Sequence, residues 1–122
     1  MRFMLLRMAD DRTEAGLRPN QEMLAAVGGY MEDMAKAGVL LGAEGLRPTS
    51  DGARVAKIGG KPVVLDGPFA ETKELIGGYC LIRTGSLEEA IDWAKRWPAL
   101  DSEVVIQIRR LYEADDFGDN LT

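Results

Sequence analysis

The amino-acid sequence predicts an α+β domain of the ferredoxin-like type, a split β-α-β arrangement with one added hairpin. The chain has 122 residues, the length of a single domain, which we place at residues 1–112 with an acidic tail over 113–122. Apolar periodicity indicates the order β-α-β, hairpin, β-α-β. The first and last strands are apolar on both faces, and two helices can cover only one face of a sheet. We therefore expect a homodimer whose two sheets face each other as a dimeric α+β barrel.

The first β-α-β unit begins with a strand over residues 1–8, where Phe3 and Leu5 alternate with Met4 and Leu6. Polar residues with a glycine and a proline then predict a loop, and the second strand of the unit begins at Val39. Because both faces of the first strand are mostly apolar, we expect it to be covered on both sides.

The helix between these strands is predicted over residues 20–37, where apolar residues recur every three or four positions. Pro19 suits the first helical turn and Gly38 suits the position just after the last turn. Gly28 and Gly29 lie mid-helix, where each costs about 1 kcal/mol relative to alanine. We expect these two glycines to allow close packing of the helix on the sheet.

The added hairpin is predicted over residues 52–58 and 61–65, two short alternating runs on either side of Gly59-Gly60. This pattern is typical of a hairpin with a primed turn. Pro62 places its strand at a sheet edge or at a strand start, since proline donates no ladder hydrogen bond.

The second β-α-β unit is predicted from a strand over 75–84, a helix and a strand over 103–112. Ser86 and Glu89 form a capping-box pattern at the start of the helix, and Pro98 ends it. The double glycine at 77–78 predicts a β-bulge or a close backbone approach within its strand.

Composition excludes several classes of function. The net charge is −5, and the 15 lysines and arginines are scattered, which argues against binding to nucleic acid or to an anionic membrane surface. One cysteine and no histidine exclude an internal disulfide and the usual zinc and copper sites, and we expect no metal and no cofactor. We expect Cys80 to be a small buried core residue. Residues 1–7 lack the pattern of a secretion signal, so we expect a cytoplasmic protein.

The candidate site is the segment 66–74, which sets a Gly-Pro turn and several acids between two apolar runs. Without histidine, acid–base chemistry must use a carboxylate, a lysine, a tyrosine or a group of the substrate. Asp66 and Glu71 can fold toward Tyr79, and two close carboxylates raise the pKa of one of them. Asp66, Glu71 and Tyr79 are therefore the predicted catalytic residues. The structural interpretations stay open: a turn-closing hydrogen bond for Asp66, a solvated turn for Glu71 and a single structural hydrogen bond for Tyr79.

Two strand arginines, Arg7 and Arg109, are the predicted ligand-binding cations. An arginine in a mostly apolar sheet is costly unless it meets a carboxylate or an anionic ligand. For Arg7 the candidate partners are a carboxylate of the 66–74 segment, Glu44 or the anionic ligand itself.

Residues 66–74 (Asp-Gly-Pro-Phe-Ala-Glu-Thr-Lys-Glu) followed by Gly77-Gly78-Tyr79 form a long and specific motif. In this motif the chain resembles the YCII-related family, in the branch named for Asp-Gly-Pro-Phe, and the similarity extends over residues 1–112. The resemblance implies a ferredoxin-like, dimeric α+β barrel. It also implies that the motif positions Asp66, Glu71, Lys73 and Tyr79 are of functional interest, with Lys73 as a further ligand-binding residue.

The resemblance leaves two functions open. Some YCII-related proteins resemble small lyases or dehydrochlorinases with a His–Asp pair, which a chain without histidine cannot reproduce. One hypothesis is a protein that binds an anionic small molecule near the dimer interface, with weak lyase or isomerase chemistry. The alternative is a non-catalytic dimeric accessory or regulatory protein, since members of this branch are often encoded beside extracytoplasmic-function sigma factors.

Overall fold

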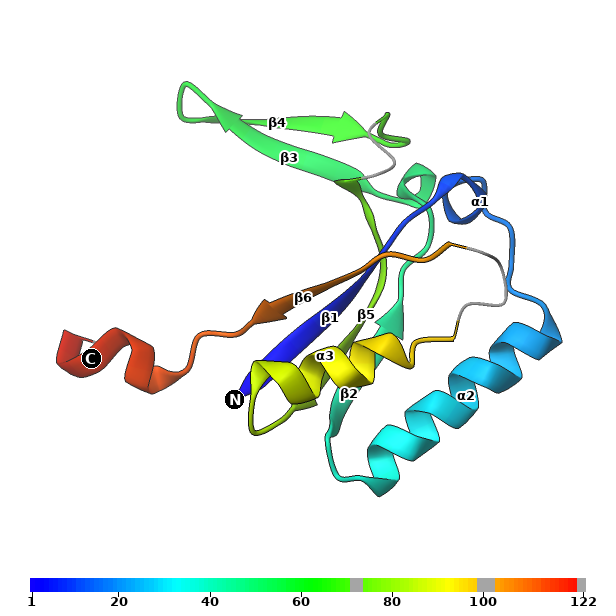
Figure 1. Cartoon of the computed structure of the whole chain (residues 1–122). Helices are drawn as coiled ribbons and strands as arrows, with labels where there is room; N and C mark the ends of the chain where they lie inside the picture. Colours follow the sequence, from blue (N-terminus) through cyan, green and yellow to red (C-terminus); the bar gives the residue numbers. More distant parts are fainter. Residues whose placement is uncertain (71–73, 99–102, 121–122) are drawn as a thin grey trace.

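The computed structural model describes residues 1–70, 74–98 and 103–120. Four strands form one antiparallel sheet in the order β2-β5-β1-β6 (Figure 1). This α+β arrangement is compatible with the predicted ferredoxin-like fold, and the sheet does not close into a barrel within one chain. The strands of this sheet are β1 (Arg2–Met8), β2 (Leu40–Gly45), β5 (Ile76–Arg83) and β6 (Ile106–Arg110).

Two helices, α2 (Gln21–Lys36) and α3 (Leu87–Lys95), cover one face of the sheet (Figure 1). The Asn20 side chain caps α2 by accepting a hydrogen bond from the backbone N–H of Met23 at 2.8 Å. Gly38 follows the helix with a φ of 75°, as predicted. Pro19, in contrast, precedes the cap and lies outside the first turn, because the better capping side chain is Asn20.

At α3, Ser86 accepts from the N–H of Glu89 at 3.1 Å, as the capping box predicts. The Glu89 carboxylate reaches back to the N–H of Gly85, one residue earlier than predicted, at 2.9 Å. The predicted start of α3 is therefore confirmed, and the hydrogen bond to the Glu89 carboxylate comes from one residue earlier in the chain than expected.

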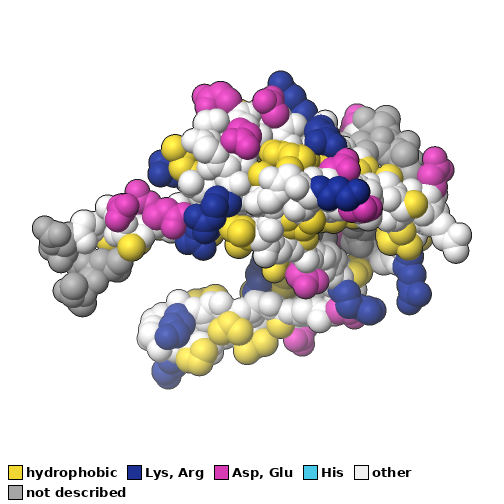
Figure 2. All heavy atoms as spheres, turned by 90° about the horizontal axis from the view of Figure 1, so that it is seen from below, with side chains coloured by type: hydrophobic (Ala, Val, Ile, Leu, Met, Phe, Trp, Pro, Cys, Tyr) yellow, Lys and Arg dark blue, Asp and Glu magenta, His cyan; other side chains and the backbone are white. Residues whose placement is uncertain are grey.

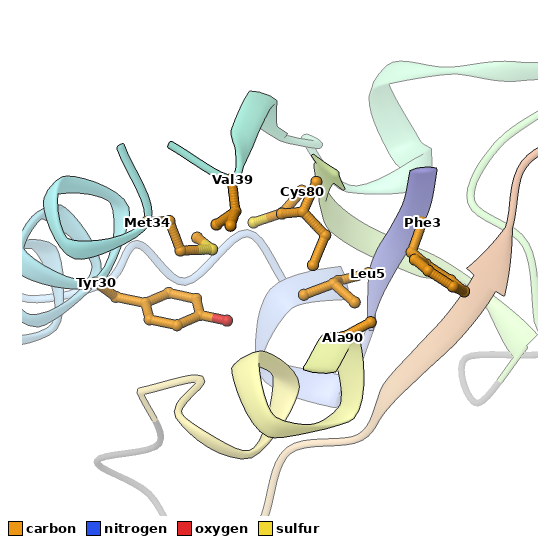
Figure 3. Close-up of a cluster of buried hydrophobic side chains, with 8 residues drawn as sticks. Phe3, Leu5, Tyr30, Met34, Val39, Cys80 and Ala90 are labelled. Carbon is orange, nitrogen blue, oxygen red and sulfur yellow. The ribbon is translucent and has the colours of Figure 1, made fainter. Parts of the chain in front are cut away.

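The core lies between this face of the sheet and the two helices (Figure 3). Tyr30 fixes the two helices to each other, because its hydroxyl donates to the carbonyl oxygen of Trp93 at 2.6 Å. Cys80 is fully buried, and this burial raises the pKa of its thiol to about 11, which confirms an inert core residue. The buried cluster consists of Phe3, Leu5, Tyr30, Met34, Val39, Cys80, Ile82 and Ala90.

The prediction that Gly28 and Gly29 pack closely on the sheet is wrong. Both residues are exposed, and a Cβ atom added at either position would meet no atom within 4 Å. They lie on the outer side of α2, so they lower its helix propensity without a packing benefit in the isolated chain.

We therefore expect the double substitution Gly28→Ala/Gly29→Ala to raise the free energy of unfolding by about 1 to 2 kcal/mol, since alanine restricts the unfolded chain and favours the helix. Urea denaturation followed by circular dichroism would measure this. Ala25→Gly, on the same exposed stretch of α2, is the matched control and should lower stability. A destabilised double variant would mean that this surface packs closely against something outside the chain.

Two short helices and the last strand differ from the predictions. Residues 9–19, expected to be a loop, contain α1 (Asp11–Glu14), where Asp10 and Thr13 cap each other reciprocally. A second short turn, η1 (Thr49–Asp51), precedes the hairpin. Strand β6 is shorter than the predicted 103–112, and it is not apolar on both faces, because its alternating residues Gln107 and Arg109 are polar and exposed.

The added hairpin consists of β3 (Ala53–Ile58) and β4 (Lys61–Asp66), which form a separate two-stranded sheet. Gly59 and Gly60 have φ values of 60° and 79°, so the primed turn is confirmed. Figure 2 shows the hairpin as a lobe that stands apart from the main body. None of the helices in the described part of the chain is long and apolar enough to cross a membrane.

Candidate functional site

The face of the four-stranded sheet that α2 and α3 leave uncovered carries the first candidate site. Directly paired residues of neighbouring strands project to the same face. Glu44, Tyr79, Leu6 and Gln107 are paired in one row across the sheet. A second row runs beside it. We call these two rows the open face; its residues are Met4, Leu6, Gly42, Glu44, Tyr79, Leu81, Gln107 and Arg109.

The open face is apolar in the middle and polar at its two edges. Met4, Tyr79 and Leu81 are half-buried and lie on the two central strands. Glu44 lies on the β2 edge and is exposed, whereas Arg109 lies on the opposite β6 edge and is also exposed. This arrangement offers an apolar floor with a carboxylate at one end and a guanidinium at the other.

Of the predicted site residues, the structure places Tyr79 and Arg109 on this one face. Arg7 is held elsewhere: its guanidinium donates to the carbonyl oxygen of Met8 at 3.0 Å and to the Asp10 carboxylate at 3.4 Å. Among the described residues the carboxylate partner of Arg7 is therefore Asp10 and not Glu44, while Glu71 of the 66–74 segment lies outside the described residues. This local contact, three residues along the chain, leaves the side chain 22% exposed.

Asp66 is the last residue of β4 and pairs with Ala53 at the base of the hairpin, where it is exposed. It belongs to the two-stranded sheet and not to the open face. Glu71 and Lys73 lie outside the described residues, so the predicted pairing of Asp66 with Glu71 stays a prediction.

The rest of the Asp-Gly-Pro-Phe turn binds to the η1 segment. The backbone N–H of Phe69 donates to Thr49 Oγ1 at 3.0 Å, and the Thr49 hydroxyl in turn donates to Glu14 Oε2 at 2.6 Å. The N–H of Thr49 donates to the other carboxylate oxygen of Glu14 at 2.9 Å. We call Glu14, Thr49, Gly67 and Phe69 the clasp.

Gly67 is required in the clasp for a steric reason. A Cβ atom at this position would lie 1.7 Å from the carbonyl oxygen of Thr49 and 2.5 Å from its carbonyl carbon. Both are backbone atoms that cannot rotate away. The Gly67-Pro68 peptide bond is cis. The glycine of the motif is therefore explained by packing alone.

Phe69 completes the clasp through its ring, which lies under the guanidinium of Arg54 from β3, 4.0 Å from the ring centroid. The clasp thus joins α1, η1 and the base of the hairpin. Glu14 and Thr49 were missed in the sequence because their partners are 35 and 20 residues away. The available signal was the threonine after Pro48, a residue type that favours turns and caps.

The double glycine forms the predicted bulge. Arg7 pairs with Gly78 and Met8 with Ile76, so Gly77 is the extra residue in β5. A Cβ atom at Gly78 would lie 3.2 Å from the carbonyl oxygen of Glu44, which confirms a close backbone approach. The bulge lies beside Tyr79 and therefore sets where that side chain leaves the strand.

The model of the family described as the YCII-related domain matches residues 1–115. The chain belongs to the YCII-related family. A protein of Rhizobium meliloti (strain 1021), named "Uncharacterized protein R00369", is 48% identical over 50 residues, which is 41% of this chain and 40% of that protein. The match thus spans less than half the length of this curated relative, whose printed name states no activity.

Two of the shallow hollows on the described surface of this YCII-related protein lie along α3 and β6. The larger, about 440 Å³, is lined by residues that include Phe3, Leu87 and Arg110, and the other, about 420 Å³, by residues that include Trp97 and Ile106. Neither contains Asp66, Tyr79 or Arg109. Within residues 1–70, 74–98 and 103–120, no cluster of acidic and cysteine side chains is arranged to hold a metal ion.

Proposed function

We propose that this protein, a cytoplasmic member of the Asp-Gly-Pro-Phe branch, is a homodimer that binds a small anionic molecule between two facing open faces. The observation that carries the proposal is the composition of the open face, an apolar floor between Glu44 and Arg109 with the Tyr79 ring between them. Such a mixture of an apolar surface and a few polar groups is typical of ligand sites.

The same surface supports the proposed dimer. Helices α2 and α3 cover only one side of the sheet, and Met4, Tyr79 and Leu81 remain half-buried on the other side. A second copy of the chain, related by a two-fold axis, would bring the same apolar residues against them. The shared space between two twisted sheets is the interior of the expected α+β barrel.

The polar groups define the class of ligand. Arg109 and the amide of Gln107 offer hydrogen-bond donors at the β6 edge, which suits a carboxylate or a phosphate. Tyr79 can donate to an oxygen of the ligand nearer the centre. Glu44, paired directly with Tyr79, is the carboxylate best placed for acid–base chemistry of the lyase or isomerase type, whereas Asp66 at the hairpin base is available only if the partner's floor approaches it.

We expect a thermal-shift screen of anionic metabolites to find a carboxylate or phosphate compound that stabilises the wild type. Arg109→Gln should then weaken its binding by about tenfold or more, since a hydrogen bond to a charged group contributes about 1.5 to 3 kcal/mol. Arg110→Gln is the matched control, because its position pairs with Phe3 on the helix-covered face. Equal losses in both variants, or no stabilising anion in the panel, would contradict the proposed ligand.

The second candidate function is a non-catalytic dimeric accessory protein, linked to extracytoplasmic-function sigma factor signalling. One observation favours it: Gly67 and Phe69 of the motif act in the clasp, so these two residues need no ligand to explain them. The same screen separates the two, since an accessory protein with a solvent-excluding dimer interface would bind no metabolite at Arg109.

A further inference from the structure

The clasp and the contact of Arg54 with Phe69 hold the base of the hairpin, and its two strands extend beyond that base. Among the described helices and strands, β3 and β4 contact extensively only each other. Figures 1 and 2 show the hairpin projecting away from the body. A two-stranded hairpin alone is marginally stable in water, so cover by another molecule would stabilise the strands that extend beyond the clasped base.

The hairpin is also apolar on both of its faces and positively charged. Val55 and Val64 pair on one face, each more than 60% exposed, and Ile58 is 66% exposed on the other. The hairpin carries three basic residues, Arg54, Lys57 and Lys61, and one acid, Asp66 at its base, in a chain whose net charge is −5. Its surface therefore fits a partner that is apolar and acidic.

Residues 112–118, which we call the acidic segment, have that character. Tyr112 is 74% exposed and Phe117 is 46% exposed, with their ring centroids 5.0 Å apart. Asp115 and Asp116 are exposed beside them. The segment leaves the end of β6 and projects from the body toward the same side as the hairpin tip (Figures 1 and 2).

The base of the acidic segment is anchored. Arg2 of β1 donates to both carboxylate oxygens of Glu113, at 2.9 and 3.2 Å. The hydrogen bond from Arg2 is the main cause that lowers the pKa of Glu113, so this carboxylate stays ionised. The segment therefore leaves the sheet in a defined direction with its aromatic rings uncovered.

We propose that the hairpin of one copy docks against the acidic segment of a second copy, so that each protomer of the dimer holds the other. This contact rests on the homodimer proposed above, and it specifies which surfaces of the two protomers meet outside the open face. Two other surfaces of a second copy fit the hairpin less well. A second hairpin would bring like charges together, and the open face has one carboxylate, Glu44, and one guanidinium, Arg109, whose charges cancel. Among the described residues, the acidic segment combines exposed aromatic rings with carboxylates, which suit aliphatic side chains and lysines respectively.

Cross-linking of the full-length protein tests the contact directly. Protein labelled with ¹⁵N is mixed with unlabelled protein, allowed to exchange subunits, and treated with a zero-length carbodiimide that joins lysine amines to carboxylates. We expect isotope-mixed peptides that join Lys57 or Lys61 to Asp115 or Asp116. Cross-links of these residues only within one isotope, or none at all, would overturn the proposal.

Charge reversal supplies the second measurement. Lys57→Glu/Lys61→Glu should weaken the dimer by about tenfold or more in sedimentation equilibrium at low salt, and Asp115→Lys/Asp116→Lys should do the same. Mixing the two variants should restore dimers, because both hairpin contacts of a mixed dimer are again complementary, one of them with its charges reversed. Lys36→Glu/Lys95→Glu, on the two helices away from the hairpin, is the control and should leave the dimer unchanged.

The outcomes separate this contact from the proposed ligand site. Unchanged dimers in both charge-reversed variants would overturn the docking of the hairpin while leaving a dimer through the open face intact. The wild type could also bind duplex DNA or anionic phospholipid vesicles. If Lys57→Glu/Lys61→Glu loses that binding while its dimerisation is unaffected, the docking of the hairpin is overturned and the hairpin is assigned to that partner.

Discussion

Replacing Gly67 with alanine is expected to lower the free energy of unfolding by about 3 kcal/mol or more, which is a large part of the stability of a small domain. The new methyl group would lie 1.7 Å from the carbonyl oxygen of Thr49, so the backbone of either the turn or η1 must move. That movement would also break the hydrogen bond from the Phe69 N–H to Thr49 Oγ1. Urea denaturation followed by tryptophan fluorescence measures the loss.

Gly52→Ala is the matched control for this experiment. Gly52 lies in the same part of the fold, and a Cβ atom there would be 3.7 Å from the same Thr49 carbonyl oxygen, an ordinary contact. Its φ of −131° is accessible to alanine. If Gly67→Ala is no less stable than Gly52→Ala, the clasp does not hold the hairpin base in the way described above.

Leu81→Glu is expected to convert the proposed homodimer to a monomer at micromolar concentration. Leu81 lies on a central strand of the open face, paired with Met4, and a two-fold axis would place two such carboxylates in one apolar interface. Unpaired buried charges of this kind cost several kcal/mol, so the dimer should weaken by about 100-fold or more. Native mass spectrometry and light scattering measure the oligomeric state.

The control for Leu81→Glu is Leu24→Glu, which introduces the same charge at an exposed leucine of α2 on the opposite side of the molecule. Circular dichroism should show a folded protein in both variants, because neither leucine belongs to the buried cluster. A folded Leu81→Glu protein that remains a dimer would exclude the open face as the interface. A monomeric wild type would exclude the proposed dimer altogether.

Much of the fold was predictable because local patterns control it. The alternation in β1, the Gly59-Gly60 turn and the capping serine of α3 each depend on residues within a few positions. The succession of β-α-β, hairpin and β-α-β predicted the ferredoxin-like class, whereas the strand order β2-β5-β1-β6 comes from the structure. The family assignment came from a contiguous motif and is confirmed for the YCII-related family, while the Asp-Gly-Pro-Phe branch stays a proposal.

The candidate site was predictable only in part. Tyr79 and Arg109 lie on one face as a consequence of strand register, which the sequence pattern does not specify for strands that are distant in the chain. Strand register also places Glu44 on this face, whereas the sequence suggests it only as a partner for Arg7. Arg7 contacts the carboxylate of Asp10, because the capping turn of the short helix α1 brings the Asp10 side chain back toward β1.

The sequence by itself determined the elements, their order and the place of the motif between two strands, since periodicity, caps and turns are short-range properties of the chain. Only the tertiary structure showed where the described residues of the motif lie and what they pack against. Gly67 is required by a backbone carbonyl 18 positions away, and Asp66 lies on the hairpin and not on the sheet with Tyr79. Contacts of this range depend on how layers pack and in which register strands pair, and no local pattern of residues encodes them directly.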